Sequence, residues 1–171
     1  LTKIFKEKTS YYPWIFDDLL KELKISGRGL IRKIIGIFNK YEGGLKPYKG
    51  VAAVFKKAKK SGYRLGIITD GNIERQKRKI KLLAIEDFFE VVIYTKENMP
   101  KPSTKPFLVA VNNLGVNPKD AFYVGDNPLV DFKGAKKIGM KTIRVLRGEF
   151  KNISKDRYID FEISRFRDMF S

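Results

Sequence analysis

The sequence predicts an α/β fold, a Rossmann-like parallel sheet flanked by helices, with a helical segment in front of it. From residue 47 onward, short apolar runs of strand length alternate with helical patterns, and several runs lead directly into polar residues. Residues 1–46 contain helical patterns only. Short strands of the buried type, separated by helices, are typical of a parallel sheet covered on both faces. We therefore expect a helical part over 1–46 and an α/β part over 47–171.

The helical part contains two apolar periodicities. From Trp14 to Lys24, and again over residues 30–38, the apolar residues recur at helical spacing. Glycines 27 and 29 separate the two patterns, and Gly43, Gly44 and Pro47 mark a junction to the next part. Two helices and a boundary near residue 46 are expected.

The α/β part alternates strands and helices in order. The predicted helices cover residues 50–60, 73–83, 107–114 and 128–138. The predicted strands cover residues 63–68, 91–94, 121–124 and 142–145, followed by a weak strand near 159–161 and a short helix. Glycines 62 and 139 suit the carboxyl-terminal ends of two of these helices.

The composition limits the chemistry. The 171 residues include no Cys and no His, which excludes disulfides, thiolate chemistry, Ser-His pairs and the commonest zinc ligand. Hydrolytic chemistry would therefore depend on carboxylates, lysines, hydroxyls and a hard cation such as Mg²⁺. No apolar run approaches the roughly 18 residues of a membrane span, and the charged start is unlike a signal peptide. We expect a cytoplasmic protein with no membrane partner.

The net charge of +17 raises the alternative of a nucleic-acid-binding protein. The lysines are spread along nearly every helix, as on ordinary solvated faces, and the densest run, over residues 75–79, has no interleaved aromatic residue to stack on bases. We therefore favour a solvated basic surface, which would also attract phosphorylated substrates, over a nucleic-acid partner.

Polar residues follow the apolar runs where ligands of a parallel sheet collect, at the carboxyl ends of the strands. At Thr69-Asp70-Gly71-Asn72, a hydroxyl and neighbouring N–H groups can bind a phosphate, although such residues also cap helices. Lys101, before Pro102, can neutralise charge on a phosphoryl group, although Pro102 and Pro106 also suit a helix entry.

A third polar group follows the strand predicted at 121–124. Gly125-Asp126-Asn127 is followed by Asp131, five positions after Asp126. Two carboxylates near a strand end suit Mg²⁺, which prefers one or two carboxylates with phosphate oxygens and waters. The alternative is a helix-capping Asp followed by a surface Asp.

Taken in order, a strand ending in Thr69, then Lys101-Pro102, then a strand into Gly125-Asp126 and Asp131, resembles motifs two, three and four of the haloacid dehalogenase-like (HAD-like) superfamily. The similarity covers about residues 47–147, and residues 1–46 look like the end of a small helical cap. The resemblance implies a phosphatase that works through an aspartyl-phosphate on a small phosphorylated metabolite.

The resemblance also implies roles for individual residues. Thr69 with the N–H of Asp70 would bind phosphate oxygens, with Gly71 in the same turn, and Lys101 would offset the charge of phosphate and nucleophile. Asp126 would ligate Mg²⁺, and Asp131 would ligate it or order the groups around it. Secondary contacts are implied for Asn72 and Asn127.

One motif of the family is absent from the sequence. The nucleophile motif, a hydrophobic strand into DxDx[TV], has no counterpart, and Asp17 and Asp18 lie in a helical pattern without a second acid two positions on. In the family this segment also supplies the central strand, so its loss would leave strand edges unpaired. We expect a truncated chain with negligible phosphatase activity, which an N-terminal segment or another polypeptide would complement.

Three other functions stay open. One is a catalytically silent HAD-like module that binds phosphate or a protein partner. Another is a basic nucleic-acid-binding protein, whose affinity would fall steeply with salt. Haloacid dehalogenation within the same superfamily is the third, and the pair of Asp126 and Asp131 favours phosphate chemistry over it.

Overall fold

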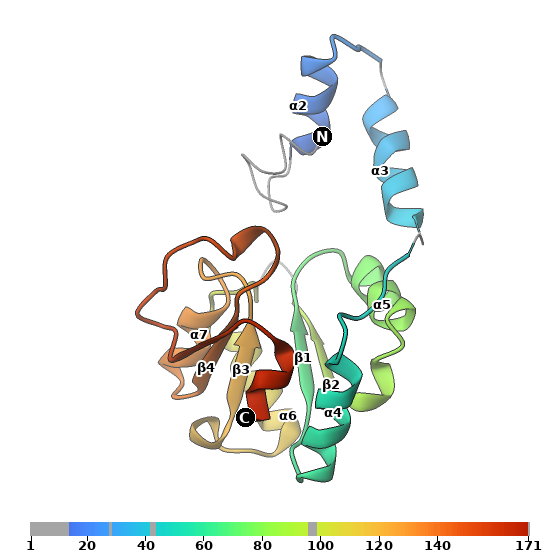
Figure 1. The fold of residues 1–171 in the computed structure, drawn as a ribbon. Coiled ribbons are helices and arrows are strands. Elements are labelled where there is room, and N and C mark those ends of the chain that lie inside the picture. Colours follow the sequence, from blue (N-terminus) through green and yellow to red (C-terminus); the bar gives the residue numbers. More distant parts are fainter. Residues whose placement is uncertain (1–13, 28, 42–43, 96–98, 171) are drawn as a thin grey trace. The chain divides into compact units, whose positions relative to one another are not determined.

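The computed structural model describes residues 14–27, 29–41, 44–95 and 99–170. The chain divides into two compact units, Leu1–Gly44 and Leu45–Ser171. Figure 1 shows the two helices of the first unit and the α/β body of the second. Each unit is described by itself below.

The first unit is a pair of helices. Helix α2 (Ile15–Glu22) packs on α3 (Leu30–Lys40), and the rings of Phe16 and Phe38 meet edge to face with centroids 5.6 Å apart. Asp17 and Asp18 lie in the first turn of α2, within a helix rather than at the end of a strand. Among the described residues of the chain, no helix is long and apolar enough to cross a membrane.

The second unit has the predicted α/β architecture, with its strands in two parallel sheets. Strand β1 (Gly66–Thr69) pairs with β2 (Val91–Tyr94). Strand β3 (Phe122–Gly125) pairs with β4 (Lys141–Val145), which pairs with β5 (Phe161–Ile163). Every described pairing is parallel, as the alternation of strands and helices predicted.

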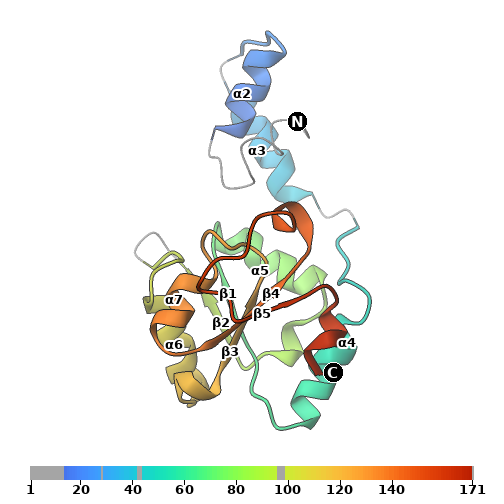
Figure 2. The same cartoon turned by 60° about the vertical axis from the view of Figure 1, so that its left-hand side comes forward.

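Helices precede and connect these strands (Figure 2). They are α4 (Val51–Lys60), α5 (Ile73–Leu82), α6 (Lys105–Leu114) and α7 (Phe132–Lys137), with short 3₁₀ turns η1 (Glu86–Phe88), η2 (Pro118–Asp120), η3 (Gly148–Phe150) and η4 (Phe166–Phe170). The helix predicted over 128–138 begins only at Phe132, because Asn127 and Pro128 open a turn in which the Asn127 side chain accepts the N–H of Leu129.

The core of the second unit joins the two sheets. Buried side chains of α6 and α7 form a cluster against which Ile68 of β1 and Tyr123 of β3 both pack. The rings of Phe107 and Tyr123 meet edge to face, with centroids 4.8 Å apart. Helix α6 therefore lies against both sheets and brings β1 and β3 to the same core.

The contact between α6 and α7 depends on Gly134. A Cβ on Gly134 would lie 2.5 Å from the Ser103 carbonyl oxygen and 2.6 Å from the Phe107 ring. Only a residue without a side chain allows this approach. The contact fixes the segment before α6, which carries Lys101.

Strands β1 and β3 each keep one edge without a partner strand among the described residues. The N–H of Thr95 donates to the Thr69 oxygen at 3.0 Å, and the N–H of Lys141 donates to the Ala121 oxygen at 3.0 Å. Because successive residues direct their backbone groups to opposite sides of a strand, those of Ile68 and Val124 point away from β2 and β4.

Candidate active site

Asp70, Lys101 and Asp131 come from three distant segments of the chain, and their side chains meet in one cluster. The Lys101 Nζ atom lies 2.6 Å from Asp131 Oδ1 and 3.6 Å from Asp70 Oδ2. Asp70 directly follows β1, and Asp131 lies between β3 and α7. The structure therefore brings Asp70, Lys101 and Asp131 together at the carboxyl ends of β1 and β3.

The charges of this cluster are buried. The side chains of Lys101 and Asp131 are 8% and 5% exposed, and that of Asp70 is 14% exposed. Burial alone would lower the pKa of Lys101, but the neighbouring Tyr123, Asp131 and Asp70 outweigh it and raise that pKa. Lys101 is therefore a permanent ammonium held between two carboxylates.

Tyr123 is the third group on Lys101. The ammonium lies 3.2 Å from the Tyr123 hydroxyl, which in turn donates to Asp131 Oδ1 at 3.3 Å. Burial raises the pKa of Tyr123, so the phenol stays protonated and can donate. Its ring packs on Phe107 of α6, which fixes the hydroxyl in place.

Each oxygen of Asp131 has donors within the protein. Oδ1 accepts from Lys101, and Oδ2 accepts the N–H groups of Asp126 at 3.2 Å and Asn127 at 2.9 Å. A Cβ on Gly125 would lie 2.5 Å from Oδ2, so glycine is needed for Asp131 to reach this turn. Asp131 thus ties Lys101 to the backbone that presents Asp126.

Asp126 is a carboxylate that could hold a cation. Burial raises the pKa of Asp126, and repulsion from Asp131 and, to a lesser degree, Glu149 adds to the rise. A bound cation would relieve this repulsion. The described residues contain no cluster of three or more carboxylates that could hold a metal. Mg²⁺ does not need one, because it is often bound by one or two carboxylates with waters and phosphate oxygens. Asp126 fits that pattern.

The turn after β1 carries several donors. The Thr69 hydroxyl donates to Gln76 Oε1 at 3.1 Å. Asp70 Oδ1 accepts hydrogen bonds from the Thr95 hydroxyl and from the N–H of Lys101, the latter at 3.4 Å. No hydrogen bond among the described residues uses the N–H groups of Asp70 and Gly71. These two N–H groups therefore remain donors for a ligand.

The side chains of Asn72 and Asn127 accept hydrogen bonds from backbone N–H groups. Asn72 Oδ1 accepts the N–H of Arg75 at 3.0 Å and so caps α5. Asn127 is 3% exposed, and its Oδ1 accepts the N–H of Leu129 at 3.0 Å. Asn72 thus has the capping role that the sequence left open, whereas Asn127 stabilises the turn before α7. The secondary contacts implied for both residues stay predictions.

Three residues of the site were not found from the sequence: Gln76, Thr95 and Tyr123. Thr95 directly follows β2, so it carried the same strand-end signal as Thr69. Tyr123 lies two residues before Gly125 inside β3, where the sequence pattern predicts a side chain of the core. Gln76 lies on α5, and no spacing rule links a helix residue to the end of the preceding strand.

Comparisons with known proteins agree on one family. Residues 7–145 match the family described as haloacid dehalogenase-like hydrolase. A glyceraldehyde 3-phosphate phosphatase of Methanocaldococcus jannaschii is 34% identical, over 99% of this chain and 75% of the relative. A pyrophosphatase PpaX of Halalkalibacterium halodurans is also 34% identical, over 61% of this chain and 50% of the relative. The crystal structure of a HAD phosphatase from Thermococcus onnurineus matches with a TM-score of 0.66 at 26% identity, over 98% of this chain and 87% of that one.

Proposed function

This chain belongs to the haloacid dehalogenase-like hydrolases, and on that premise we propose that it is the phosphate- and cation-binding part of a phosphatase. The reaction would be hydrolysis of a small phosphorylated metabolite through an aspartyl-phosphate. The aspartate nucleophile would come from a segment that is not among these 171 residues.

The observation that carries this proposal is the position of Lys101. Its ammonium contacts Asp131 at 2.6 Å and lies 3.6 Å from Asp70. These contacts lie at the carboxyl ends of β1 and β3, each of which has one edge with no partner strand among the described residues. A nucleophile at the end of a strand between β1 and β3 would lie beside this charge. Phosphoryl transfer depends on such fixed positive charge near the transferring group.

The roles of the other residues follow from their contacts. The Thr69 hydroxyl and the N–H groups of Asp70 and Gly71 would bind phosphate oxygens. Asp126 would ligate Mg²⁺, which when bound supplies charge neutralisation for the phosphate. Both Asp131 oxygens already accept hydrogen bonds, so we assign Asp131 to orienting Lys101 and the Asp126 turn rather than to direct ligation.

The names of the relatives guide the choice of substrate. Relatives 34% identical to this chain are named glyceraldehyde 3-phosphate phosphatase and pyrophosphatase PpaX. We propose glyceraldehyde 3-phosphate as the first substrate to test, because that relative matches 99% of this chain. Pyrophosphate is the second.

We propose that a strand carrying DxDx[TV] inserts between β1 and β3. The sequence contains no such motif, and Asp17 and Asp18 lie in helix α2 of the first unit. The outward backbone groups of Ile68 and Val124 would supply hydrogen bonds to such a strand. We assign the helical pair α2–α3 to part of a cap, as the resemblance implies.

Phosphate release from glyceraldehyde 3-phosphate in the presence of Mg²⁺ tests the proposal. We expect negligible turnover by this chain alone, because phosphate monoester hydrolysis is among the slowest uncatalysed reactions. Adding the part of the M. jannaschii relative that this chain does not match should produce turnover, and the variant Lys101→Met should abolish it. Rapid turnover by the 171-residue chain alone would contradict the assignment of the nucleophile to another segment.

A catalytically silent phosphate- or protein-binding module is the second candidate function, favoured by the absence of DxDx[TV] from the sequence. It predicts Mg²⁺-dependent phosphate binding with no turnover after complementation. A nucleic-acid partner would instead show binding to DNA or RNA that weakens steeply as salt rises. We do not expect such binding, because the positive charge is spread over most helices.

A further inference from the structure

We propose that Gln76 is a positioning residue of the phosphate-binding turn and acts through the Thr69 hydroxyl. This inference rests on the proposed function, because it assumes that Thr69 binds a phosphate oxygen. Gln76 lies on α5, outside the motif residues that follow β1, β2 and β3. The position of Gln76 in the sequence alone does not predict a role in the site.

The geometry places the Gln76 amide against both ends of the turn. Its Oε1 accepts the Thr69 hydroxyl at 3.1 Å. Its Nε2 lies 3.2 Å from the position of a Cβ on Gly71, whose φ is +110°. The Gln76 side chain therefore contacts Thr69, at the start of the turn, and covers Gly71.

A hydroxyl has a single proton, so the proton that Thr69 gives to Gln76 is not available to a phosphate oxygen. The terminal torsion of glutamine is broad and roughly two-fold, so the amide can turn over and present Nε2 to the Thr69 oxygen. Thr69 then accepts from Gln76 and donates to phosphate. The hydroxyl stays in one place in both states, and the two hydrogen bonds strengthen each other.

The first test needs no ligand. In the wild type, three-bond couplings to the Thr69 methyl carbon should report one χ1 rotamer, because Gln76 fixes the hydroxyl. In Gln76→Leu, which has a similar size but no hydrogen-bonding group, the couplings should be averaged over rotamers. Unchanged couplings in Gln76→Leu would overturn the inference, whatever the outcome for phosphate.

The second test is a double-mutant cycle on binding of inorganic phosphate in the presence of Mg²⁺. Thr69→Val should weaken binding about tenfold, as expected for loss of a hydrogen bond to a charged group. Gln76→Leu should weaken it about threefold, as for a neutral hydrogen bond. In the Thr69→Val background, Gln76→Leu should add no further loss, because its effect passes through the hydroxyl.

The control is Glu74→Gln, on the exposed side of the same helix, which should change binding by less than about twofold. Additive losses in the double variant would overturn the inference and leave the proposed function intact, since Gln76 would then act without Thr69. If Thr69→Val binds phosphate as well as the wild type, the Thr69 hydroxyl does not bind phosphate and the inference fails alone. If the wild type fails to bind phosphate, the proposed function fails and the inference fails with it.

Discussion

The Lys101 ammonium is the counter-charge for Asp70 and Asp131, so its removal would leave two largely buried carboxylates unpaired. Breaking a buried ion pair on one side costs more than the pair itself contributes, because the remaining charge has lost both water and partner. The Asp131 side chain is 5% exposed, and its second oxygen orders the Asp126 turn. Replacing Lys101 should therefore also disturb the turn that holds Asp126, the proposed cation ligand.

We predict that Lys101→Met lowers the free energy of unfolding by roughly 3–5 kcal/mol at neutral pH. The measurement is urea denaturation of the full chain. Lys105→Met, at the exposed start of α6, is the matched control and should change stability by less than about 0.5 kcal/mol. Equal losses in the two variants would mean that the Asp70 and Asp131 contacts contribute nothing to stability.

At the residue scale, the sequence predicted where Lys101, Asp126 and Asp131 lie, because carboxyl ends of parallel strands share one edge. It did not predict how they are partnered. The carboxylate of Asp70 contacts Thr95 and Lys101, whereas only the Asp70 N–H had been considered. Such contacts depend on side-chain rotamers and on distant segments, and neither leaves a periodic signal in the sequence.

Helices α6 and α7 approach so closely that a methyl group at Gly134 would overlap two carbonyl oxygens and the Phe107 ring. We predict that Gly134→Ala destabilises the second unit by about 1–3 kcal/mol, the usual cost of overpacking. Gly36 in α3 is the matched control, because a Cβ there meets nothing within 4 Å.

Gly36→Ala should leave stability unchanged or raise it by up to about 1 kcal/mol, since Ala is the better helix former. Thermal unfolding followed by circular dichroism distinguishes the two glycines. If Gly134→Ala unfolded at the same temperature as the wild type, the contact between α6 and the Gly134 backbone would be looser than described.

Asp160 lies directly before β5 and links it to β4. Its carboxylate accepts hydrogen bonds from the N–H of Thr142 at 2.9 Å and from Lys136. Partial burial acts to raise the pKa of Asp160, but the hydrogen bonds from Lys136 and Thr142 outweigh it and hold the pKa below its usual value of 3.8. A lowered pKa in the folded state means that the ionised form stabilises the fold above the unfolded-state pKa.

We therefore predict that Asp160→Asn destabilises the protein at neutral pH and that this difference disappears in acid. The difference from the wild type should be constant well above pH 3.8 and should shrink as the pH falls from there through the lower folded-state pKa. Urea denaturation of both proteins at several pH values checks this. A difference that persists unchanged at the acid end would show that Asp160 acts by shape and not by charge.

The elements themselves were well predicted, because strands and helices leave periodic patterns of apolar residues. Strand β2 covers the predicted residues 91–94, and the weak strand expected near 159–161 lies at 161–163. The late start of α7 was missed because the hydrogen bond from Leu129 to Asn127 replaces the first turn of the predicted helix. Local side-chain contacts of this kind override the periodicity.

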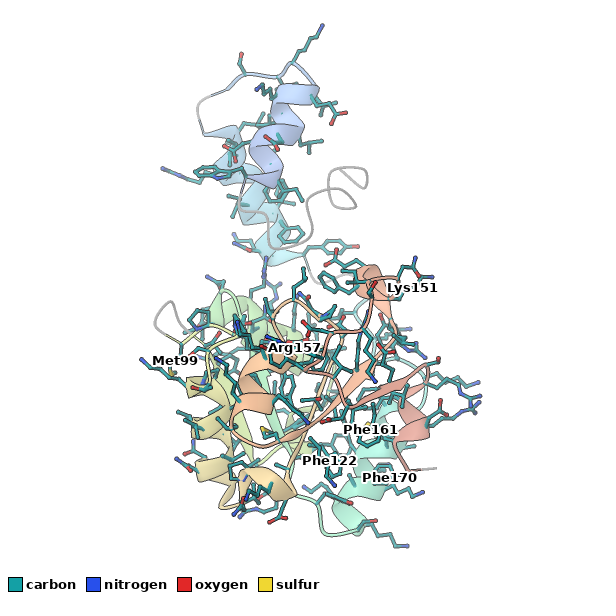
Figure 3. All side chains as sticks on the ribbon, turned by 90° about the vertical axis from the view of Figure 1, so that its left-hand side faces the viewer. Met99, Phe122, Lys151, Arg157, Phe161 and Phe170 are labelled. Atoms are coloured by element: carbon teal, nitrogen blue, oxygen red, sulfur yellow. The ribbon has the colours of Figure 1, made fainter. Side chains whose placement is uncertain are left out.

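In the second unit as a whole, the sheet falls into two parts that share one helical core. Ile68 of β1 and Tyr123 of β3 pack on the same cluster, and Lys101 joins the ends of the two strands, yet no described strand pairs with their facing edges. Tyr123 faces that cluster, so Phe122 beside it (Figure 3) faces the other way. Phe122 is 43% exposed. An uncovered apolar side chain next to an open strand edge favours an added strand.

Hydrogen exchange of single amides tests this arrangement. In the chain alone, the amides of Ile68 and Val124, which point away from β2 and β4, should exchange quickly, whereas those of Thr69 and Tyr123 should be protected. Addition of the unmatched part of the M. jannaschii relative should slow exchange at Ile68 and Val124 and leave the other two amides nearly unchanged. The alternation is the decisive feature, because general stabilisation would slow all four amides together. Protection of Ile68 and Val124 in the chain alone would mean that β1 and β3 already have partners and that no strand is missing between them.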